Sequence, residues 1–221
     1  MSESLPVISV LGGTGKEGRA LASRLARAGY PIVIGSRDPA RAAEAASTVI
    51  ETTGSQKVSG ASLDEAAAGG AIVLLTVPRS GQLSTLEQVR PHLQGKILVD
   101  VTVPLVPPRV AKVQLPECGS AVVEAQRLLG AGVRVVSAFQ NISHERLEAL
   151  GEPVGCDVLV CSDDKEARQV VVDLATAAGM RAYHAGALAN STAAEALTSV
   201  LIFMNGFYKA HGAGIQIVGI D

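Results

Sequence analysis

The chain has 221 residues, 48% of them hydrophobic and 18% charged, which is too apolar a composition for a disordered protein. Its 19 Lys and Arg residues nearly balance 21 Asp and Glu residues, so it lacks the strong positive field that draws proteins to nucleic acids or anionic membranes. The longest clean apolar run, residues 71–77, is too short to span a bilayer. We therefore expect a globular protein with small-molecule partners and no nucleic-acid or membrane partner.

The cysteines indicate a reducing compartment. Cys118, Cys156 and Cys161 form an odd set without a CxxC pair, which argues against a disulfide framework or a zinc site. The first six residues lack the basic region of a signal peptide. The sequence predicts a cytoplasmic protein with reduced thiols and no metal site.

Short β-branched segments alternate with Ala- and Leu-rich helical segments, a pattern typical of βαβ units. In chain order we expect a strand at residues 7–11, a helix at 16–28, a strand at 31–34, a helix at 39–51 capped by Asp38, a strand near 56–59, a brief helix capped by Ser62, a strand at 71–76, a helix at 82–89 and a strand at 97–101. Four prolines then predict a long ordered loop over residues 101–119, followed by a helix at 120–129 and a strand at 133–137.

The last part of the chain is smaller. It predicts helices at 145–150, 165–178 and 191–209 and strands at 157–161 and 181–184, with Asp163 and Asp164 capping the second of these helices. The fold class is therefore α/β, with a Rossmann-type doubly wound parallel sheet in residues 1–140 and a smaller C-terminal α/β part in residues 141–221.

A glycine-rich segment lies between the first strand and the first helix. Gly13-Thr14-Gly15-Lys16-Glu17-Gly18 fits the GxGxxG pattern in the position that dinucleotide binding requires. Gly13 permits the tight turn, Gly15 lets the backbone approach a pyrophosphate, and Gly18 allows the helix to pack closely. The helix N-terminus supplies free N–H donors. The alternative is that the glycines only permit a strand-to-helix turn, and Lys16 can equally be a solvated side chain.

The residues after the second strand favour NADP over NAD. Ser36 and Arg37 offer a hydroxyl and a planar cation to a 2′-phosphate, and Arg41 lies one helical turn further on. In the alternative, Asp38 accepts hydrogen bonds from the ribose of NAD. Because Asp38 is also the expected helix cap, we predict NADP as the cofactor.

Six segments carry a resemblance to a known family: LGGTGKEG at residues 11–18, GSR at 35–37, LTVP at 75–78, VSAF at 136–139, LANS at 188–191 and GAGI at 212–215. In their order and spacing the chain resembles the deazaflavin-dependent NADP reductases. These enzymes pass a hydride between NADP and coenzyme F-420, an 8-hydroxy-5-deazaflavin. The resemblance implies an oxidoreductase that uses NADP and coenzyme F-420.

The resemblance also implies which residues bind these molecules. Thr14, Ser36, Arg37 and Arg41 would hold the 2′-phosphate side of NADP, Gly15, Lys16 and Glu17 would lie along the pyrophosphate, and Arg79 and Leu83 would flank the adenosine half. Thr76, Val77, Pro78, Val103 and Pro104 would approach the ribose and nicotinamide, as C-terminal strand ends do in open α/β sheets. The deazaflavin would lie against residues 137–143, including Ala138, Gln140, Asn141 and Ile142, and against the surroundings of Asn190, Ser191, Gly206 and Phe207, with the smaller C-terminal part completing this acceptor site.

Gln140 departs from the family pattern, which usually has His at this position, and Gln cannot carry a positive charge at neutral pH. The four histidines are scattered, and no HExxH or GxSxG motif is present, so no catalytic side chain is expected. Hydride transfer between two bound rings needs positioning above all. The alternatives are an NADPH reductase of another small acceptor and a non-catalytic NADP sensor. The apolar terminal helix, with Phe203, Met204, Phe207 and Tyr208, predicts a core or homodimer contact.

Overall fold

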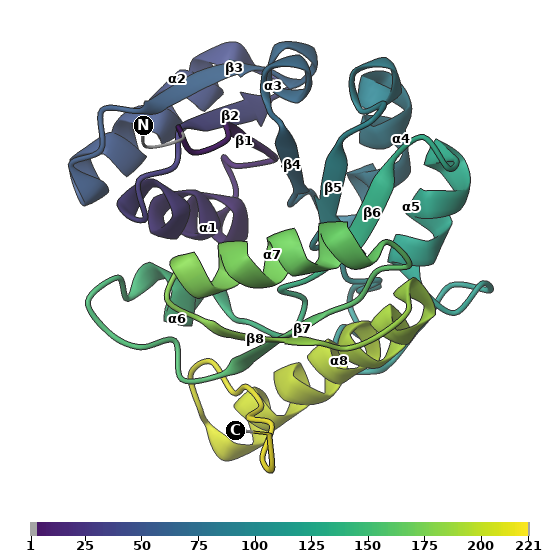
Figure 1. Cartoon of the computed structure of the whole chain (residues 1–221). Coiled ribbons are helices and arrows are strands. Elements are labelled where there is room, and N and C mark those ends of the chain that lie inside the picture. Colours follow the sequence, from purple (N-terminus) through teal and green to yellow (C-terminus); the bar gives the residue numbers. More distant parts are fainter. Residues whose placement is uncertain (1–3, 221) are drawn as a thin grey trace.

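A computed structural model describes residues 4–220 and contains a six-stranded parallel sheet (Figure 1). Its strands are β1 (Ile8–Leu11), β2 (Ile32–Ser36), β3 (Val58–Ser62), β4 (Ile72–Leu75), β5 (Ile97–Asp100) and β6 (Arg134–Ser137), in the order β3-β2-β1-β4-β5-β6. The strand order reverses between β1 and β4, which makes this pair the topological switch point. The predicted α/β class and doubly wound sheet are confirmed.

Helices cover both faces of this sheet. One face bears α1 (Lys16–Arg27) and α2 (Pro39–Thr53), and the other bears α3 (Leu63–Gly69), α4 (Arg79–Val89) with the short 3-10 turn η1 (Arg90–His92), and α5 (Ala121–Leu129). Side chains alternate between the two cores along β1, since Val10 packs with α1 and α2 while Leu11 packs with α3. The strands are therefore apolar on both faces, as buried parallel strands require.

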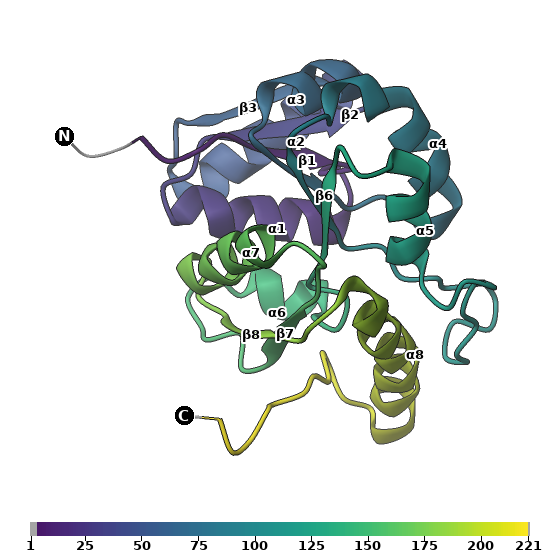
Figure 2. The ribbon, with the colours of Figure 1, turned by 45° about the vertical axis from the view of Figure 1, so that its right-hand side comes forward.

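The rest of the chain forms a second layer below the sheet (Figure 2). It consists of α6 (His144–Glu148), β7 (Asp157–Val160), α7 (Lys165–Ala177), β8 (Arg181–His184), the 3-10 turn η2 (Leu188–Asn190) and α8 (Ser191–Tyr208). β7 and β8 pair in parallel, and α7 lies between this small sheet and the large one (Figure 1). An antiparallel bridge between Ser137 and Cys161 links the two sheets. Within residues 4–220, no helix combines the length and the apolar character needed to cross a membrane.

Most element boundaries agree with the prediction, and the expected caps at Asp38, Ser62 and Asp164 are confirmed by side-chain bonds to the helix N–H groups. Three boundaries were wrong. The strand expected at 56–59 lies at 58–62, because its pairing with β2 continues to Ser62. The small residues of this strand have a low strand propensity, so the sequence did not indicate its full length. Gly60 is required here because an added Cβ would collide with the backbone of Ala42 in α2.

The other two differences concern helix ends. α4 begins at Arg79 rather than residue 82, since Pro78 has the φ of −57° that precedes a helix and its carbonyl accepts from the N–H of Gly81 at 2.8 Å. α6 ends at Glu148 rather than residue 150, where Ala149 leaves the helical conformation. Residues 101–119 form the expected loop and contain no helix or strand.

A buried arginine joins the two layers. The guanidinium of Arg24, on α1, donates to the carbonyl oxygens of Leu147 at 2.8 Å and of Arg146 and Ala149 at 2.9 Å. These carbonyls lie at the end of α6, where a cation is stabilised by the helix dipole. The N-terminus of α1 therefore adjoins the glycine-rich loop, and its C-terminal half is bonded to the second layer.

A buried carboxylate fastens α8 to the large sheet. Glu195 accepts from the hydroxyl of Ser120 at 2.6 Å and from the backbone N–H of Ala121 at 2.7 Å and Val122 at 3.3 Å, at the N-terminus of α5. Burial raises the pKa of Glu195, although these donors act in the opposite direction.

Candidate functional site

The glycine-rich loop turns sharply after β1. The turn includes Gly12, which has a φ of +86°, and Gly13, whose N–H donates to the Val10 carbonyl at 3.2 Å. A side chain at Gly13 would be crowded, because an added Cβ would lie 3.0 Å from Ile34 and 3.1 Å from the Val10 carbonyl. The prediction for Gly18 is confirmed, since its Cβ would overlap the Thr76 hydroxyl and lie 2.8 Å from the Gly13 Cα. Glycine at position 18 thus lets α1 pack closer to the loop and to β4 than a residue with a side chain would allow.

The first turn of α1 has free N–H donors. Gly15 is the N-cap residue, has no side chain to cap the helix and is exposed together with Lys16, while Thr14 is half-buried. This helix end lies beyond β1, beside β4, at the switch point of the sheet. An anion placed there would meet unpaired donors and the positive end of the helix dipole.

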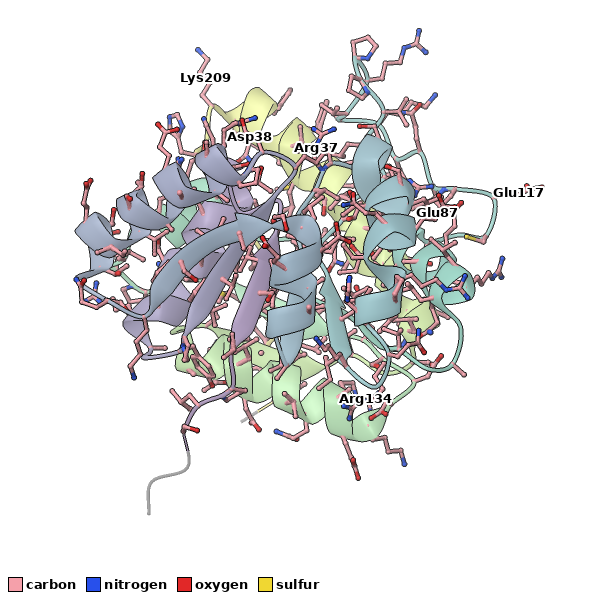
Figure 3. All side chains as sticks on the ribbon, turned by 90° about the horizontal axis from the view of Figure 1, so that it is seen from above. Arg37, Asp38, Glu87, Glu117, Arg134 and Lys209 are labelled. Atoms are coloured by element: carbon pink, nitrogen blue, oxygen red, sulfur yellow. The ribbon has the colours of Figure 1, made fainter. Side chains whose placement is uncertain are left out.

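The turn after β2 presents two free cations. Arg37 and Arg41 are exposed, and neither takes part in an ion pair within residues 4–220. Figure 3 labels Arg37 and Asp38 at the molecular surface in this turn. Asp38 accepts from the N–H of Ala40 at 3.0 Å, and its own N–H donates to the buried Ser36 hydroxyl at 3.2 Å. The carboxylate is therefore engaged as a helix cap.

The residues after β4 differ in their availability. Thr76 donates its hydroxyl to the Leu11 carbonyl at 3.0 Å, and Val77 and Leu83 are half-buried, while Pro78 is exposed. Arg79, expected beside the adenosine, donates to Gln82 and to Glu124, both at 2.5 Å, and so is directed toward α5.

A polar network follows β5. The carboxylate of Asp100, fully buried, accepts from Gln82 at 2.5 Å and from the N–H of Thr102 at 2.9 Å. Its burial raises its pKa, which these bonds and the charge of Arg79 partly oppose. The Asp100 carbonyl accepts from the Gln140 side-chain amide at 2.8 Å. Gln140 is therefore held in place by the end of β5.

A cavity of about 350 Å³ lies beyond β5 and β6, between the first turn of α1 and α8. It is lined by Glu17, Val101, Val103, Leu105, Phe139, Gln140, Asn141, Ile142, Ser143, His144, Glu145, Thr198, Leu201, Ile202, Asn205 and Ala213. Five residues singled out from the sequence, namely Glu17, Val103, Gln140, Asn141 and Ile142, are thus brought together. Pro104 and Ala138 are buried beside them but do not line the cavity.

The part of α8 that lines the cavity lies between the residues named from the sequence at the two ends of this helix. Ser191 is buried on Ser120 at 2.7 Å, Asn190 donates to the Ala185 carbonyl at 2.7 Å, and Phe207 is 68% exposed, so these residues lie outside the cavity, as does Gly206. The wall comes instead from Thr198, Leu201, Ile202 and Asn205. Their spacing of i, i+3, i+4 and i+7 is the signal that marks one helix face.

The loop after β6 is strained and carries unpaired acceptors. Phe139 is buried with a φ of +73°, a conformation that costs a non-glycine residue about 1–3 kcal/mol and recurs at functional sites. The side-chain oxygens of Gln140 and Asn141 are buried without a partner, while their amide nitrogens are engaged. Glu17 Oε1 is likewise unpaired, and burial together with Glu148 raises the pKa of Glu17 to about 8. The cavity therefore presents polar atoms that a ligand can satisfy.

The chain is similar to several known proteins in sequence and in structure. A family model described as "NADP oxidoreductase coenzyme F420-dependent" matches residues 7–104. The "F420-dependent NADP reductase" of Methanocaldococcus jannaschii is 40% identical over 97% of this chain and 99% of its own length. The chain belongs to the F420-dependent NADP oxidoreductase family.

Other members of the F420-dependent family extend the likeness. The reductase of the same name from Methanothermobacter thermautotrophicus is 42% identical over 96% of this chain and 95% of its own length. The crystal structure of a candidate F420-dependent NADP reductase from Arthrobacter sp. FB24 superposes with a TM-score of 0.81 at 26% identity, covering 96% of this chain and 99% of that one. The predicted family is confirmed over nearly the whole chain.

Proposed function

We propose that this protein transfers a hydride reversibly between NADP(H) and coenzyme F-420, in the direction set by the cellular concentrations. The observation that carries the proposal is the cavity that opens beside the first turn of α1 and beyond β5 and β6. It lies next to the loop on which a dinucleotide would rest, so a second flat molecule could face the nicotinamide there. Two full-length relatives named for this activity support it.

The residues present fit NADP. The uncapped N-terminus of α1 suits the pyrophosphate, and Gly12, Gly13 and Gly18 let the loop, α1 and the strand ends pack closely around this N-terminus. Arg37 and Arg41, exposed and without ion-pair partners among residues 4–220, suit the 2′-phosphate together with Ser36. The remaining NADP contacts that we propose are Thr14, Gly15, Lys16, Glu17, Thr76, Val77, Pro78, Arg79, Leu83, Val103 and Pro104.

The cavity fits the pyrimidine edge of a deazaflavin, which offers an N–H donor to unpaired acceptor oxygens. Those oxygens belong to Gln140 and Asn141, and Ile142 and Ala138 belong to the same proposed site. Thr198 donates its hydroxyl to the Gln140 carbonyl at 2.8 Å and so holds this segment against α8. When both molecules are bound, the nicotinamide and the deazaflavin exchange the hydride, and the protein's part is to hold them in place and exclude water.

The direct test mixes the purified protein with NADPH and oxidised coenzyme F-420 and follows the loss of the deazaflavin's visible absorbance. We expect rapid bleaching with NADPH and little with NADH. Arg37→Glu should weaken NADPH binding by about tenfold or more, because a carboxylate repels the 2′-phosphate, and Glu44→Gln on the exposed side of α2 serves as the control. Measurable NADPH binding without bleaching would refute the deazaflavin as acceptor.

A second candidate is an NADPH-dependent reductase of another small acceptor, and Gln140 is the observation that favours it. Its side-chain amide donates to the Asp100 carbonyl and is neutral at physiological pH, so it lacks the positive charge that a histidine could provide. Turnover of NADPH with a different acceptor, and none with coenzyme F-420, would establish it. Tight NADPH binding with no acceptor at all would instead indicate a sensor.

We also propose that the chain is a cytoplasmic homodimer and that its parts divide near residue 140. α8 exposes Val200 (44%), Phe203 (57%), Met204 (38%) and Phe207 (68%) on its outer side, an apolar face that a second copy could cover. The three cysteines are unpaired, which suits a reducing compartment. Light scattering should give twice the chain mass for the wild type and the chain mass for Phe203→Glu.

A further inference from the structure

Glu17 is half-buried, and its carboxyl group differs from the three buried carboxylates of residues 4–220 in lacking hydrogen-bond donors. Asp100, Asp157 and Glu195 each accept at least two hydrogen bonds from side chains or backbone N–H groups. Among the unpaired buried side-chain atoms of residues 4–220, Glu17 Oε1 is the single carboxylate oxygen. A charged carboxylate oxygen that is buried without a donor is costly, so Oε1 disfavours the ionised form of Glu17.

The surroundings of Glu17 favour its neutral form. Burial and the negative charge of Glu148 raise the pKa of Glu17 to about 8. The charged and titratable groups on the two helices packed against α1 are His144, Glu145, Arg146 and Glu148 on α6 and Arg41, Glu44 and Glu51 on α2. Two arginines of these helices, Arg24 on α1 and Arg146 on α6, donate to backbone carbonyls rather than to Glu17. No ion pair within residues 4–220 includes Glu17.

The carboxyl group of Glu17 lines the cavity beside two other polar side chains. Glu17 lines it together with Gln140 and Asn141, whose unpaired amide oxygens carry no proton and can only accept hydrogen bonds. Of these three side chains, Glu17 is the one that can both donate a hydrogen bond and release a proton. Reduction of a deazaflavin by NADPH consumes one hydride and one further proton, which must reach a ring nitrogen.

We propose that Glu17 holds the proton that accompanies the hydride into the acceptor. This inference rests on the proposed function. As the hydride leaves NADPH for a ring carbon of the acceptor, the Glu17 O–H bond breaks and an N–H bond forms on the acceptor ring. The electron pair of the O–H bond stays on the Glu17 carboxylate, which then takes a proton from water. The acceptor gains two electrons and two hydrogens, and NADPH becomes NADP⁺.

The test compares Glu17→Gln, which keeps the size and a donor but has no proton to release, with Glu166→Gln, which removes an exposed acid from the first turn of α7. In the free protein, infrared spectroscopy should detect the C=O stretch of a protonated carboxylic acid at pH 7 that disappears near pH 8. This band should be absent from Glu17→Gln and present in Glu166→Gln. Its absence from the wild type would overturn the proposal without any turnover measurement.

Kinetics complete the test. With NADPH and coenzyme F-420 at saturation, the wild-type kcat should fall as the pH rises through about 8, and Glu17→Gln should lose about 10²-fold in kcat and this pH dependence. Glu17→Leu, which suits a buried position, should give the same loss should Glu17→Gln prove unstable.

The outcomes separate the two proposals. Full kcat and an unchanged pH profile in Glu17→Gln, with an active wild type, would refute the proton role alone. Absence of bleaching by the wild type would refute the proposed function, and the proton role with it.

Discussion

Replacing Gly18 by alanine tests the close contact between the glycine-rich loop and α1. The new Cβ would overlap the Thr76 hydroxyl and lie 2.8 Å from the Gly13 Cα and 3.0 Å from the Gly12 carbonyl, so backbone must move. Overpacking of this kind costs about 1–3 kcal/mol. Alanine in a helix recovers about 0.5–1 kcal/mol of that. We therefore expect the free energy of unfolding to fall by about 1–2 kcal/mol.

The assay is urea unfolding followed by circular dichroism, with an NADPH titration at the same pH. Gly81→Ala in α4 is the matched control, because its Cβ meets no atom within 4 Å, and it should leave stability unchanged or raise it by up to about 1 kcal/mol. NADPH should bind more weakly to Gly18→Ala alone, since the displaced loop no longer presents its N–H groups correctly. A Gly18→Ala protein as stable as the wild type, with unchanged NADPH affinity, would refute the reasoning.

Adding Thr76→Ala sharpens the result. Removal of the hydroxyl relieves one of the three overlaps and leaves those with Gly13 and Gly12. The double variant should therefore show a coupling of about 0.5–1 kcal/mol and only partial recovery. Complete recovery would place the strain in the side chain rather than in the loop backbone.

Three further predictions concern stability. Arg24→Met should lower the free energy of unfolding by about 3 kcal/mol or more, because the carbonyls at the end of α6 lose their donor. Arg27→Met is the control, because Arg27 is exposed and donates to one carbonyl, and it should cost under about 1 kcal/mol. Equal effects of the two variants in urea unfolding would contradict the bridging role of Arg24. Glu195 has a raised pKa in the folded protein, so its contribution to stability is present below its unfolded pKa of about 4.5 and is lost as the pH rises through the folded value. In a pH series of thermal unfolding, the melting temperature should therefore fall less with rising pH for Glu195→Gln than for the wild type. Asp164→Ala removes the cap of α7 and should cost about 1 kcal/mol, and an unchanged melting temperature would show the cap to be dispensable.

The large sheet could be predicted from the sequence because its strands are buried on both faces and its helices carry local caps. Asp38, Ser62 and Asp164 are local signals of this kind, acting through hydrogen bonds two or three residues away. β3 was misplaced because Gly60 and its small neighbours have low strand propensity and owe their conformation to pairing with β2 and packing under α2.

In the candidate site, too, contiguous segments could be predicted from the sequence, whereas contacts between distant helices could not. The glycine-rich loop and the Ser36–Arg37 turn are contiguous segments whose spacing already specifies their chemistry. The α8 wall and the unpaired Glu17 carboxyl depend on how α1, α6 and α8 pack, which no local pattern encodes. The spacing of Thr198, Leu201, Ile202 and Asn205 places them on one helix face but does not indicate what that face meets.

The Glu195 contact means that the protein carries its own anion at one of its helix termini. In a doubly wound sheet the helices of both halves present N-terminal donors near the same edge, and α1 leaves its donors open while α5 has already bound a carboxylate from α8. Glu195 thus acts as an intramolecular ligand of the α5 N-terminus, whose donors are no longer available to an external anion as those of α1 are. The same contact fixes the N-terminal part of α8, and the helix continues from there into the cavity wall at Thr198, Leu201, Ile202 and Asn205.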